Sequence, residues 1–175
     1  EVMGAHVGPY ECHITGRRIR LATRAGVALF GDMGIEANLL EFGEEQKRQL
    51  KAAVALHKKH RALIFSGNLI RFDMHDFESA FGIVSQNRRE ALFSYALLKT
   101  SPQSTPGRFL FRGLKRKAHY DVKIAWPLAP RSYSGSILDV IGSTPVSGDA
   151  LMRAGMQLPI MEPESLLVFH LVQAS

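Results

Sequence analysis

The spacing of apolar residues changes near Gly67, and this change constrains the fold more than any other feature of the chain. Before Gly67, apolar residues recur every three to four positions, the spacing that lines one face of an α-helix. After Gly67 they form short runs of β-branched and aromatic residues separated by Gly, Pro, Asn and Ser, as expected of strands. The pattern predicts an α+β chain of two units, residues 1–66 and residues 67–175.

The first unit is expected to hold two helices with a short strand between them. We predict a helix from Leu21 to Phe30, a strand from Ile35 to Leu40, and a longer helix from Glu44 to Ser66 that Gly67 ends in a left-handed conformation. The apolar stripe of the second helix consists of Leu50, Ala53, Val54, His57 and Ile64. Helix, strand and helix in this order form one step of an α/β repeat.

The second unit is expected to be an antiparallel β-sandwich. Its seven predicted strands are Leu69 to Asp73, Phe81 to Ser85, Ala91 to Leu98, Phe109 to Phe111, Tyr120 to Trp126, Ile137 to Ile141 and Leu166 to Val172. The segment from Ser147 to Gly155 begins with an N-cap residue and ends in glycine, so it predicts one or two helical turns. Alternation from Tyr120 to Trp126 places both rings on one strand face, and we expect Trp126 to be buried.

Charge and composition exclude several classes of function. The net charge of +6 and pI near 9.7 would suit nucleic acid only if the charges gathered on one face beside stacking aromatics. The one basic cluster, Arg112 to Lys117, lacks such aromatics and is interpreted as a solvated hairpin, so no nucleic-acid partner is expected. Apolar runs such as Leu166 to Phe169 fall short of the roughly 20 residues of a membrane helix, so no membrane partner is expected. Cys12 is the single cysteine, which excludes an internal disulfide and a cysteine metal site.

Two groups of residues could in principle bind a metal ion or transfer protons. Asp73, His75 and Asp76 are close in sequence, but in an extended segment only the first two share a face, and no further ligand is spaced nearby. His6 and His13 near Cys12 lack a further ligand at a fixed offset. Phosphate-binding glycine loops and the G-x-S-x-G elbow of hydrolases do not occur. We therefore predict no catalytic, cofactor-binding or metal-binding residue, and no cofactor.

Six segments in order resemble the carboxyl-terminal part of family 36 glycoside hydrolases, the bacterial and fungal α-galactosidases or melibiases. These segments are MGAHVGP, CHITGRRIRLATRAGVALFGDMGIE, KKHRALIFSGNLIRFD, FGIVSQNRREALF, FRGLKRKAHYDV and SGDALMRAGMQLPIMEPESLLVFHL. The chain departs from the family pattern at Ala37, Asn38, His57, Lys115 and Arg116. These departures concern local packing and surface charge.

The resemblance implies an architecture of an amino-terminal sandwich, a central (β/α)8 barrel and a small carboxyl-terminal antiparallel sandwich. MGAHVGP would end barrel strand seven, Ile35 to Leu40 would be strand eight, and Glu44 to Ser66 the last barrel helix. The resemblance also implies that the chain begins inside a longer enzyme, as its opening Glu1-Val2 suggests. His6 would lie near the carboxyl end of a barrel strand, where barrel enzymes place functional residues, although a structural loop histidine is the commoner case.

Family members are retaining hydrolases that use two aspartates, of which the nucleophile follows a Lys-Trp motif and the acid/base lies in a Trp-x-x-Asp segment. Neither motif occurs here, because the single tryptophan, Trp126, precedes Pro127, Leu128 and Ala129. None of the six aspartates matches either position: Asp32, Asp73, Asp76, Asp121, Asp139 and Asp149. The resemblance therefore implies an accessory part of an α-galactosidase that is inactive alone.

The expected partners are the remainder of the same barrel, an α-galactoside bound by the whole enzyme, and a second copy of the chain. Residues before Gly67 would otherwise expose apolar surface, so we expect them to fold onto the sandwich or to pack against that second copy. A cytoplasmic location is favoured. A transferase for raffinose-type sugars and an α-N-acetylgalactosaminidase stay open as activities of the parent enzyme.

Two other classes of function also stay open, a free-standing carbohydrate-binding module and a protein-interaction module. A sugar-binding module would need exposed aromatic side chains on one face. The candidates are scattered along the sequence: Tyr10, Tyr95, Tyr120, Trp126 and Tyr133.

Overall fold

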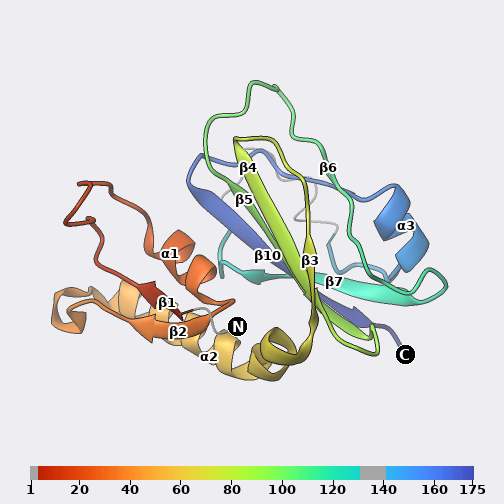
Figure 1. The fold of residues 1–175 in the computed structure, drawn as a ribbon, viewed down its shortest axis with the longest axis horizontal. Helices are drawn as coiled ribbons and strands as arrows, with labels where there is room; N and C mark the ends of the chain where they lie inside the picture. The colour runs from red at the N-terminus through yellow and green to blue at the C-terminus, as the bar shows by residue number, and fades with distance from the viewer. Residues whose placement is uncertain (1–3, 131–140) are drawn as a thin grey trace.

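The computed structural model describes residues 4–130 and 141–175. These residues form three layers, and a six-stranded antiparallel sheet is the middle layer (Figure 1). Helices α1 (Leu21–Ala28) and α2 (Glu44–Ser66) cover one face of the sheet. A two-stranded sheet and the short helix α3 (Gly148–Arg153) lie on the other face. The predicted α+β class is confirmed.

The central sheet has the strand order β3-β4-β5-β10-β7-β8, and each neighbouring pair is antiparallel. Its strands are β3 (Asn68–Arg71), β4 (Glu78–Val84), β5 (Glu90–Leu97), β10 (Ser165–Gln173), β7 (His119–Trp126) and β8 (Val146–Ser147). The two-stranded sheet on the face opposite α1 and α2 pairs β6 (Arg108–Phe109) with β9 (Met156–Gln157). The last strand of the chain therefore lies in the middle of the sheet.

Both faces of the two strands in the middle of the sheet, β5 and β10, are buried, and these strands are apolar at most positions. On β5, Phe93 and Tyr95 face a core shared with β6 and α3, whereas Leu92 faces a core shared with α1 and α2. On β10, Leu167 and Val168 divide between the same two cores. Strands covered on both sides have continuous apolar runs in place of strict alternation, and this explains why β5 and β10 do not alternate.

A β-bulge near the end of β7 corrects the prediction that Tyr120 and Trp126 share one strand face. The register with β10 shifts between Val168 and Phe169, so that Trp126 pairs with Val168 while Ile124 pairs with Phe169. The extra residue turns Trp126 to the opposite face, which packs against α1 and α2. The predicted burial of Trp126 is nevertheless confirmed, because the residue is 1% exposed.

The strand predicted over Ile35 to Leu40 is wrong. The strand is β2 (Asp32–Ile35), which pairs in parallel with β1 (Gly4–Val7). The later residues form the short 3-10 helix η1 (Leu39–Glu41), because the side chain of Asn38 accepts a hydrogen bond from the backbone N–H of Leu40 and caps this turn.

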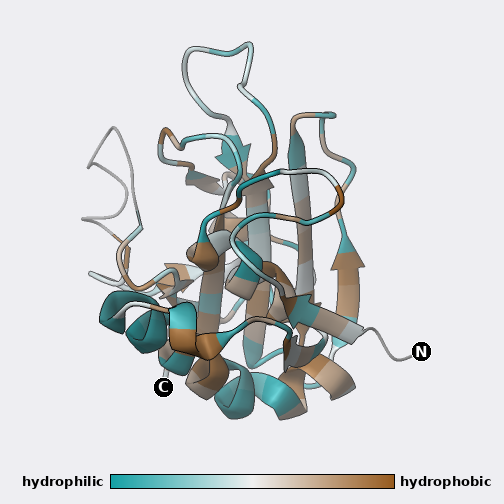
Figure 2. Ribbon diagram, turned by 90° about the vertical axis from the view of Figure 1, so that its left-hand side faces the viewer, coloured by the Kyte–Doolittle hydropathy of each residue, from teal (hydrophilic) through white to brown (hydrophobic). Residues whose placement is uncertain are grey.

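Helix α2 has the predicted bounds, but Gly67 does not end it in a left-handed conformation. Gly67 has a φ of −77°, and a Cβ at this position would lie 2.4 Å from Cγ2 of Ile83. The glycine thus permits close approach of the helix end to β4. Figure 2 shows hydrophilic and hydrophobic residues alternating around α2, as expected of a helix with one face against the protein.

The remaining predictions concern the other helices and one strand. Helix α1 ends at Ala28, two positions before the predicted end. Helix α3 forms where it is predicted, with the Ser147 hydroxyl accepting the backbone N–H of Ala150. Most of the strand predicted over Ile137 to Ile141 lies outside the described residues. Within residues 4–130 and 141–175, no helix is both long and apolar enough to cross a membrane.

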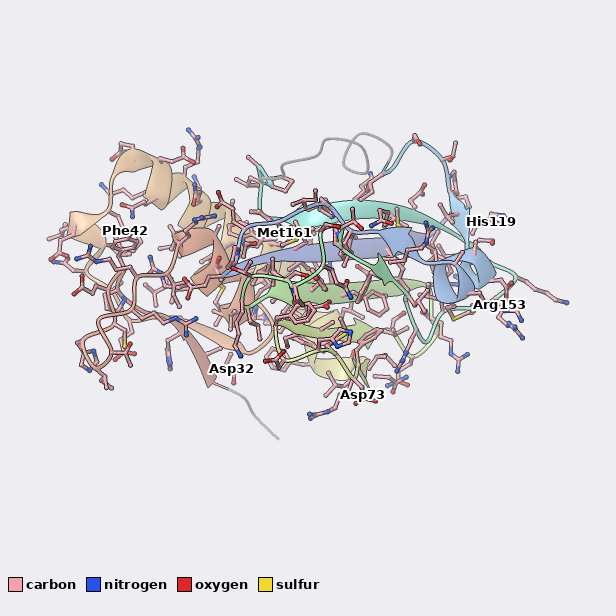
Figure 3. The ribbon with its side chains drawn as sticks, turned by 90° about the horizontal axis from the view of Figure 1, so that it is seen from above. Asp32, Phe42, Asp73, His119, Arg153 and Met161 are labelled. Atoms are coloured by element: carbon pink, nitrogen blue, oxygen red, sulfur yellow. The ribbon has the colours of Figure 1, made fainter. Side chains whose placement is uncertain are left out.

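Residues 4–66 pack onto the sheet and share a core with it. This core joins Val7, the inner faces of α1 and α2, and side chains of four sheet strands, among them Ile83, Leu92, Trp126, Leu166 and Val168. Phe42 lies toward one end of the molecule, and His119 and Arg153 lie toward the other (Figure 3). Of the two possibilities weighed for the first unit, the structure shows packing against the sheet.

Candidate functional site

His6 lies on β1, exposed to solvent and beside Gly34 of β2. The two residues are paired in register, and a Cβ on Gly34 would lie 2.3 Å from Cδ2 of His6. The imidazole therefore covers the surface that a side chain at position 34 would occupy. In a parallel sheet of a barrel, this carboxyl end of the strands is the edge at which functional residues gather.

Arg24 of α1 closes the loop that follows β1. Its guanidinium donates to the backbone carbonyls of Gly8 and Ile19, the latter at 3.0 Å from Nε. Burial lowers the pKa of Arg24. The same loop carries Cys12, whose pKa is lowered chiefly by a hydrogen bond with the Thr15 side chain. Arg24 thus anchors both ends of the loop to the helix.

The histidines, aspartates and cysteine considered as metal ligands from the sequence are predicted to bind no metal, and this stays a prediction. The structure shows the contacts of two of them. Asp76 forms an ion pair with Lys99 at 3.1 Å, and the His75 ring stacks on Phe77 with centroids 5.2 Å apart. In the part of the chain that the structure describes, the one group of His, Cys, Asp and Glu with metal-binding spacing contains none of these residues.

The basic cluster from Arg112 to Lys117 is a loop and not the predicted hairpin. Leu114 is buried in the core, and the Tyr120 hydroxyl accepts the backbone N–H of Lys115 at 3.0 Å. The charged groups separate, because the Arg112 guanidinium lies over the ring of Phe72 while Arg116 pairs with Asp149. The cationic groups therefore have different partners.

Among the described residues, the aromatic side chains considered for sugar binding do not form a platform. Tyr10 is 55% exposed, whereas Tyr95, Tyr120 and Trp126 are buried. Tyr133 lies outside the described residues. A groove of about 390 Å³ passes between α1, the start of α2 and the end of β7, with Arg20, Gln49 and Leu128 among its lining residues. Tyr10 and Trp126 also line this groove.

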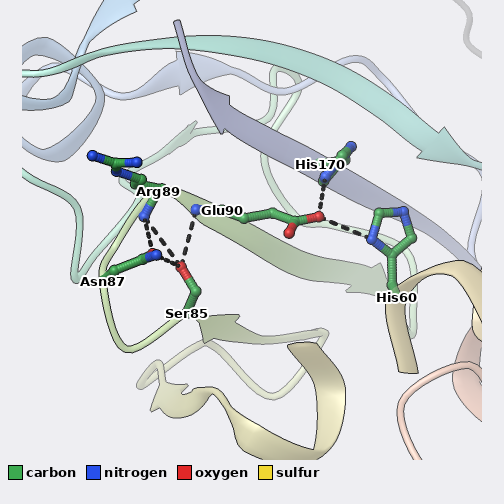
Figure 4. A network of polar contacts seen from close by, with 6 residues as sticks. All are labelled: His60, Ser85, Asn87, Arg89, Glu90 and His170. Carbon is green, nitrogen blue, oxygen red and sulfur yellow. Dashed lines mark hydrogen bonds and ion pairs between the residues drawn. The ribbon is translucent and has the colours of Figure 1, made fainter. Parts of the chain in front are cut away.

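Three side chains from distant parts of the sequence meet between α2 and the sheet (Figure 4). Oε1 of Glu90, at the start of β5, lies 3.1 Å from Nδ1 of His60 on α2 and 2.8 Å from Nε2 of His170 on β10. The two imidazole rings have centroids 4.4 Å apart. One ligand atom from each residue falls within 4.8 Å of the other two.

The turn before β5 fixes the backbone of Glu90. The Ser85 hydroxyl accepts the backbone N–H groups of Arg89 and Glu90 and donates to the Asn87 side chain at 2.9 Å (Figure 4). This network places the first residue of the strand, and the side chain of Glu90 then faces α2. The carboxylate lies at the edge of the interface between α2 and the sheet, and the Glu90 side chain is 38% exposed.

Burial, followed by the neighbouring His170, lowers the pKa of His60, although Glu90 acts in the opposite direction. The His60 side chain is 2% exposed, and its Nε2 has no hydrogen-bond partner in the described structure. The ring is therefore held neutral near neutral pH, with Nδ1 directed at the carboxylate.

Sequence reasoning missed this cluster. A signal was present for two of the residues, because His170 interrupts the apolar run of β10 and His60 falls three positions after His57 on the buried stripe of α2. Glu90 gave no such signal, since it follows a polar turn. The separation of the three residues in sequence hid their proximity.

Two family models match the chain in sequence order. The Melibiase model matches residues 1–67, and the model of the glycosyl hydrolase family 36 C-terminal domain matches residues 78–171. An α-galactosidase from Escherichia coli is 32% identical over 182 residues, a match that covers 99% of this chain and 26% of that protein. The chain thus spans about a quarter of this relative.

Solved structures show the same arrangement. An α-galactosidase from Lactobacillus brevis superposes with a TM-score of 0.82 at 26% identity, covering 99% of this chain and 22% of that one. A family 36 α-galactosidase from Geobacillus stearothermophilus in complex with raffinose gives a TM-score of 0.83 at 27% identity, covering 98% of this chain and 22% of that one.

Proposed function

The chain belongs to glycosyl hydrolase family 36, and from this premise we propose that it is the carboxyl-terminal part of a retaining α-galactosidase, inactive by itself. The substrates of the whole enzyme are terminal α-galactosyl groups of oligosaccharides such as melibiose and raffinose. Two relatives support this substrate class. The E. coli protein is named an α-galactosidase, and the G. stearothermophilus α-galactosidase was solved in complex with raffinose.

The single observation that carries the proposal is the succession of two family models along the chain. Residues 1–66 then supply the last α/β units of the catalytic barrel, and residues 67–175 supply the carboxyl-terminal domain. Strands β1 and β2 pair in parallel, as two neighbouring strands of such a barrel do. In this proposal, the strands beside β1 and β2 in the barrel belong to the rest of the same enzyme.

Inactivity of this chain alone follows from the chemistry of retaining hydrolysis. Such a site needs two carboxylates about 5 Å apart, one as nucleophile and one as general acid and base. Neither family motif that carries these aspartates occurs in the sequence. Several carboxylates of the chain instead pair with cations, as Asp76 does with Lys99 and Asp149 with Arg116.

The test of this proposal is hydrolysis of p-nitrophenyl α-galactoside by the purified chain, with the full-length E. coli relative as positive control. We expect no release of p-nitrophenol above the buffer blank. Release that disappears in a variant of this chain, such as His6→Ala, would contradict the proposal.

The sugar-binding module is tested separately with a glycan array. We expect no bound glycan, because three of the four described candidate aromatics are buried. Saturable binding that is lost in Tyr10→Ala would favour the module over the accessory part of an enzyme.

A further inference from the structure

The cluster of His60, Glu90 and His170 joins three elements that the sequence separates widely. His60 lies on the second half of α2, Glu90 opens β5, and His170 lies inside β10. The register pairs His170 with Leu92, so Glu90 lies two residues further along the same face of β5. All three side chains thus enter the space between α2 and the sheet.

The donor atoms are of the kind that zinc-class ions prefer. Two imidazole nitrogens and a carboxylate oxygen form a recognised ligand set for Zn²⁺, with metal–ligand bonds of about 2.0–2.2 Å. Ligand atoms at tetrahedral positions around such an ion are roughly 3.4 Å apart. Oε1 of Glu90 lies 3.1 Å from Nδ1 of His60 and 2.8 Å from Nε2 of His170. Both distances fall within about 0.6 Å of that spacing, and all three ligand atoms lie within 4.8 Å of one another.

The partial exposure of the cluster also suits a cation. The Glu90 side chain is partly exposed, which leaves a route for an ion and a place for a water ligand. In the described residues the buried Nε2 of His60 has no hydrogen-bond partner, so the contact of Nδ1 with Glu90 is the polar contact that holds this ring.

We propose that His60, Glu90 and His170 form a binding site for a divalent transition-metal ion of the zinc class, which ties α2 to the central sheet. Its role is structural in this proposal, because one ion would hold together ligands from α2, β5 and β10. It does not depend on the glycosidase assignment. The competing explanation is a cluster held by hydrogen bonds alone.

The experiment uses the untagged chain stripped with EDTA and titrated with Co²⁺ and then Zn²⁺. We expect saturation at a single equivalent, visible absorption bands of four-coordinate Co²⁺, displacement by Zn²⁺, and a higher denaturation midpoint with Zn²⁺. Glu90→Gln and His170→Gln should each weaken binding by about 100-fold or more. The matched control His119→Gln removes an exposed histidine of β7 and should bind as the unaltered chain does.

A second measurement does not depend on the variants folding. Nitrogen-15 NMR of the imidazole rings in the unaltered chain should show that Zn²⁺ shifts Nδ1 of His60 and Nε2 of His170. Absence of Co²⁺ and Zn²⁺ binding would overturn the proposal in favour of the hydrogen-bonded cluster. Binding that shifts other histidines and leaves these two atoms unchanged would overturn it as well.

Discussion

Trp126 joins the end of β7 to helix α1, and its removal should cost more stability than most single substitutions. The side chain is 1% exposed, and its indole N–H donates to the backbone carbonyl of Ala22 at 2.7 Å. A Cβ on Gly26 would lie 2.9 Å from the indole, which shows how closely the helix approaches the ring. The perturbation chosen is Trp126→Ala, which removes both the ring and the hydrogen bond.

The expected cost can be estimated from the buried surface. A buried tryptophan removes roughly 150–250 Å² from water, which at about 25 cal/mol per Å² corresponds to about 4–6 kcal/mol. Alanine retains a small part of this contribution, and the site collapses to some extent, so we predict a loss of about 3–5 kcal/mol. Trp126→Phe retains most of the apolar area and should cost about 1–3 kcal/mol, chiefly through the lost hydrogen bond.

Urea denaturation followed by far-ultraviolet circular dichroism measures both costs. Trp126 is the single tryptophan, so its fluorescence in the unaltered chain should also show an emission maximum typical of a buried indole. Leu128→Ala is the matched control, because Leu128 is 60% exposed on the same segment and should change the stability by less than about 0.5 kcal/mol. A loss below about 1 kcal/mol for Trp126→Ala, or emission like that of free indole, would refute the reasoning.

Three further predictions concern the same fold. Gly26→Ala places a Cβ 2.5 Å from Cδ1 of Leu166. The resulting strain of about 1–3 kcal/mol should exceed the helix-propensity gain of about 1 kcal/mol, so the thermal midpoint should fall. An unchanged or raised midpoint would contradict this. Tyr120→Phe removes a hydroxyl that donates to the backbone carbonyl of Arg88 at 2.7 Å, and should cost about 1–3 kcal/mol in urea denaturation, whereas a loss near zero would argue against that contact. Burial lowers the pKa of His60 in the folded chain, so in metal-free buffer the unfolded chain takes up a proton first, and stability is lost as pH falls below about 6.5. His60→Gln should show a flatter dependence of stability on pH in this range, and an equal dependence in both proteins would contradict the assignment.

The long helix and the apolar strands were predictable because their signals are local. Helix α2 has an acidic first turn and a clear apolar stripe, and it forms over the predicted residues. The runs that became β5 and β10 are apolar over most of their length, since both faces of the sheet are covered. Periodicity and composition suffice for such elements.

The misplaced features depend on contacts between distant residues. Strand β2 begins at Asp32 because it pairs with β1, and the sequence of β2 alone gives little indication of this pairing. The bulge that redirects Trp126 depends on the register with Val168, which lies more than 40 positions away. The cluster at His60 was missed for the same reason, because its ligand atoms meet only after three elements have packed.

The buried polar contacts around α1 and α2 explain how the helices are held in one position on the sheet. Apolar surfaces alone permit helices to slide or rotate with little change in buried area, whereas a buried hydrogen bond has one partner and loses its energy when displaced. The Trp126 indole fixes α1 against β7, and Nδ1 of His57 lies 3.0 Å from the Leu29 carbonyl and fixes α2 against the end of α1. His60 adds the third contact, to Glu90 of β5. Each contact joins a different pair of elements, so together they define the position of both helices in a way that the apolar core could not.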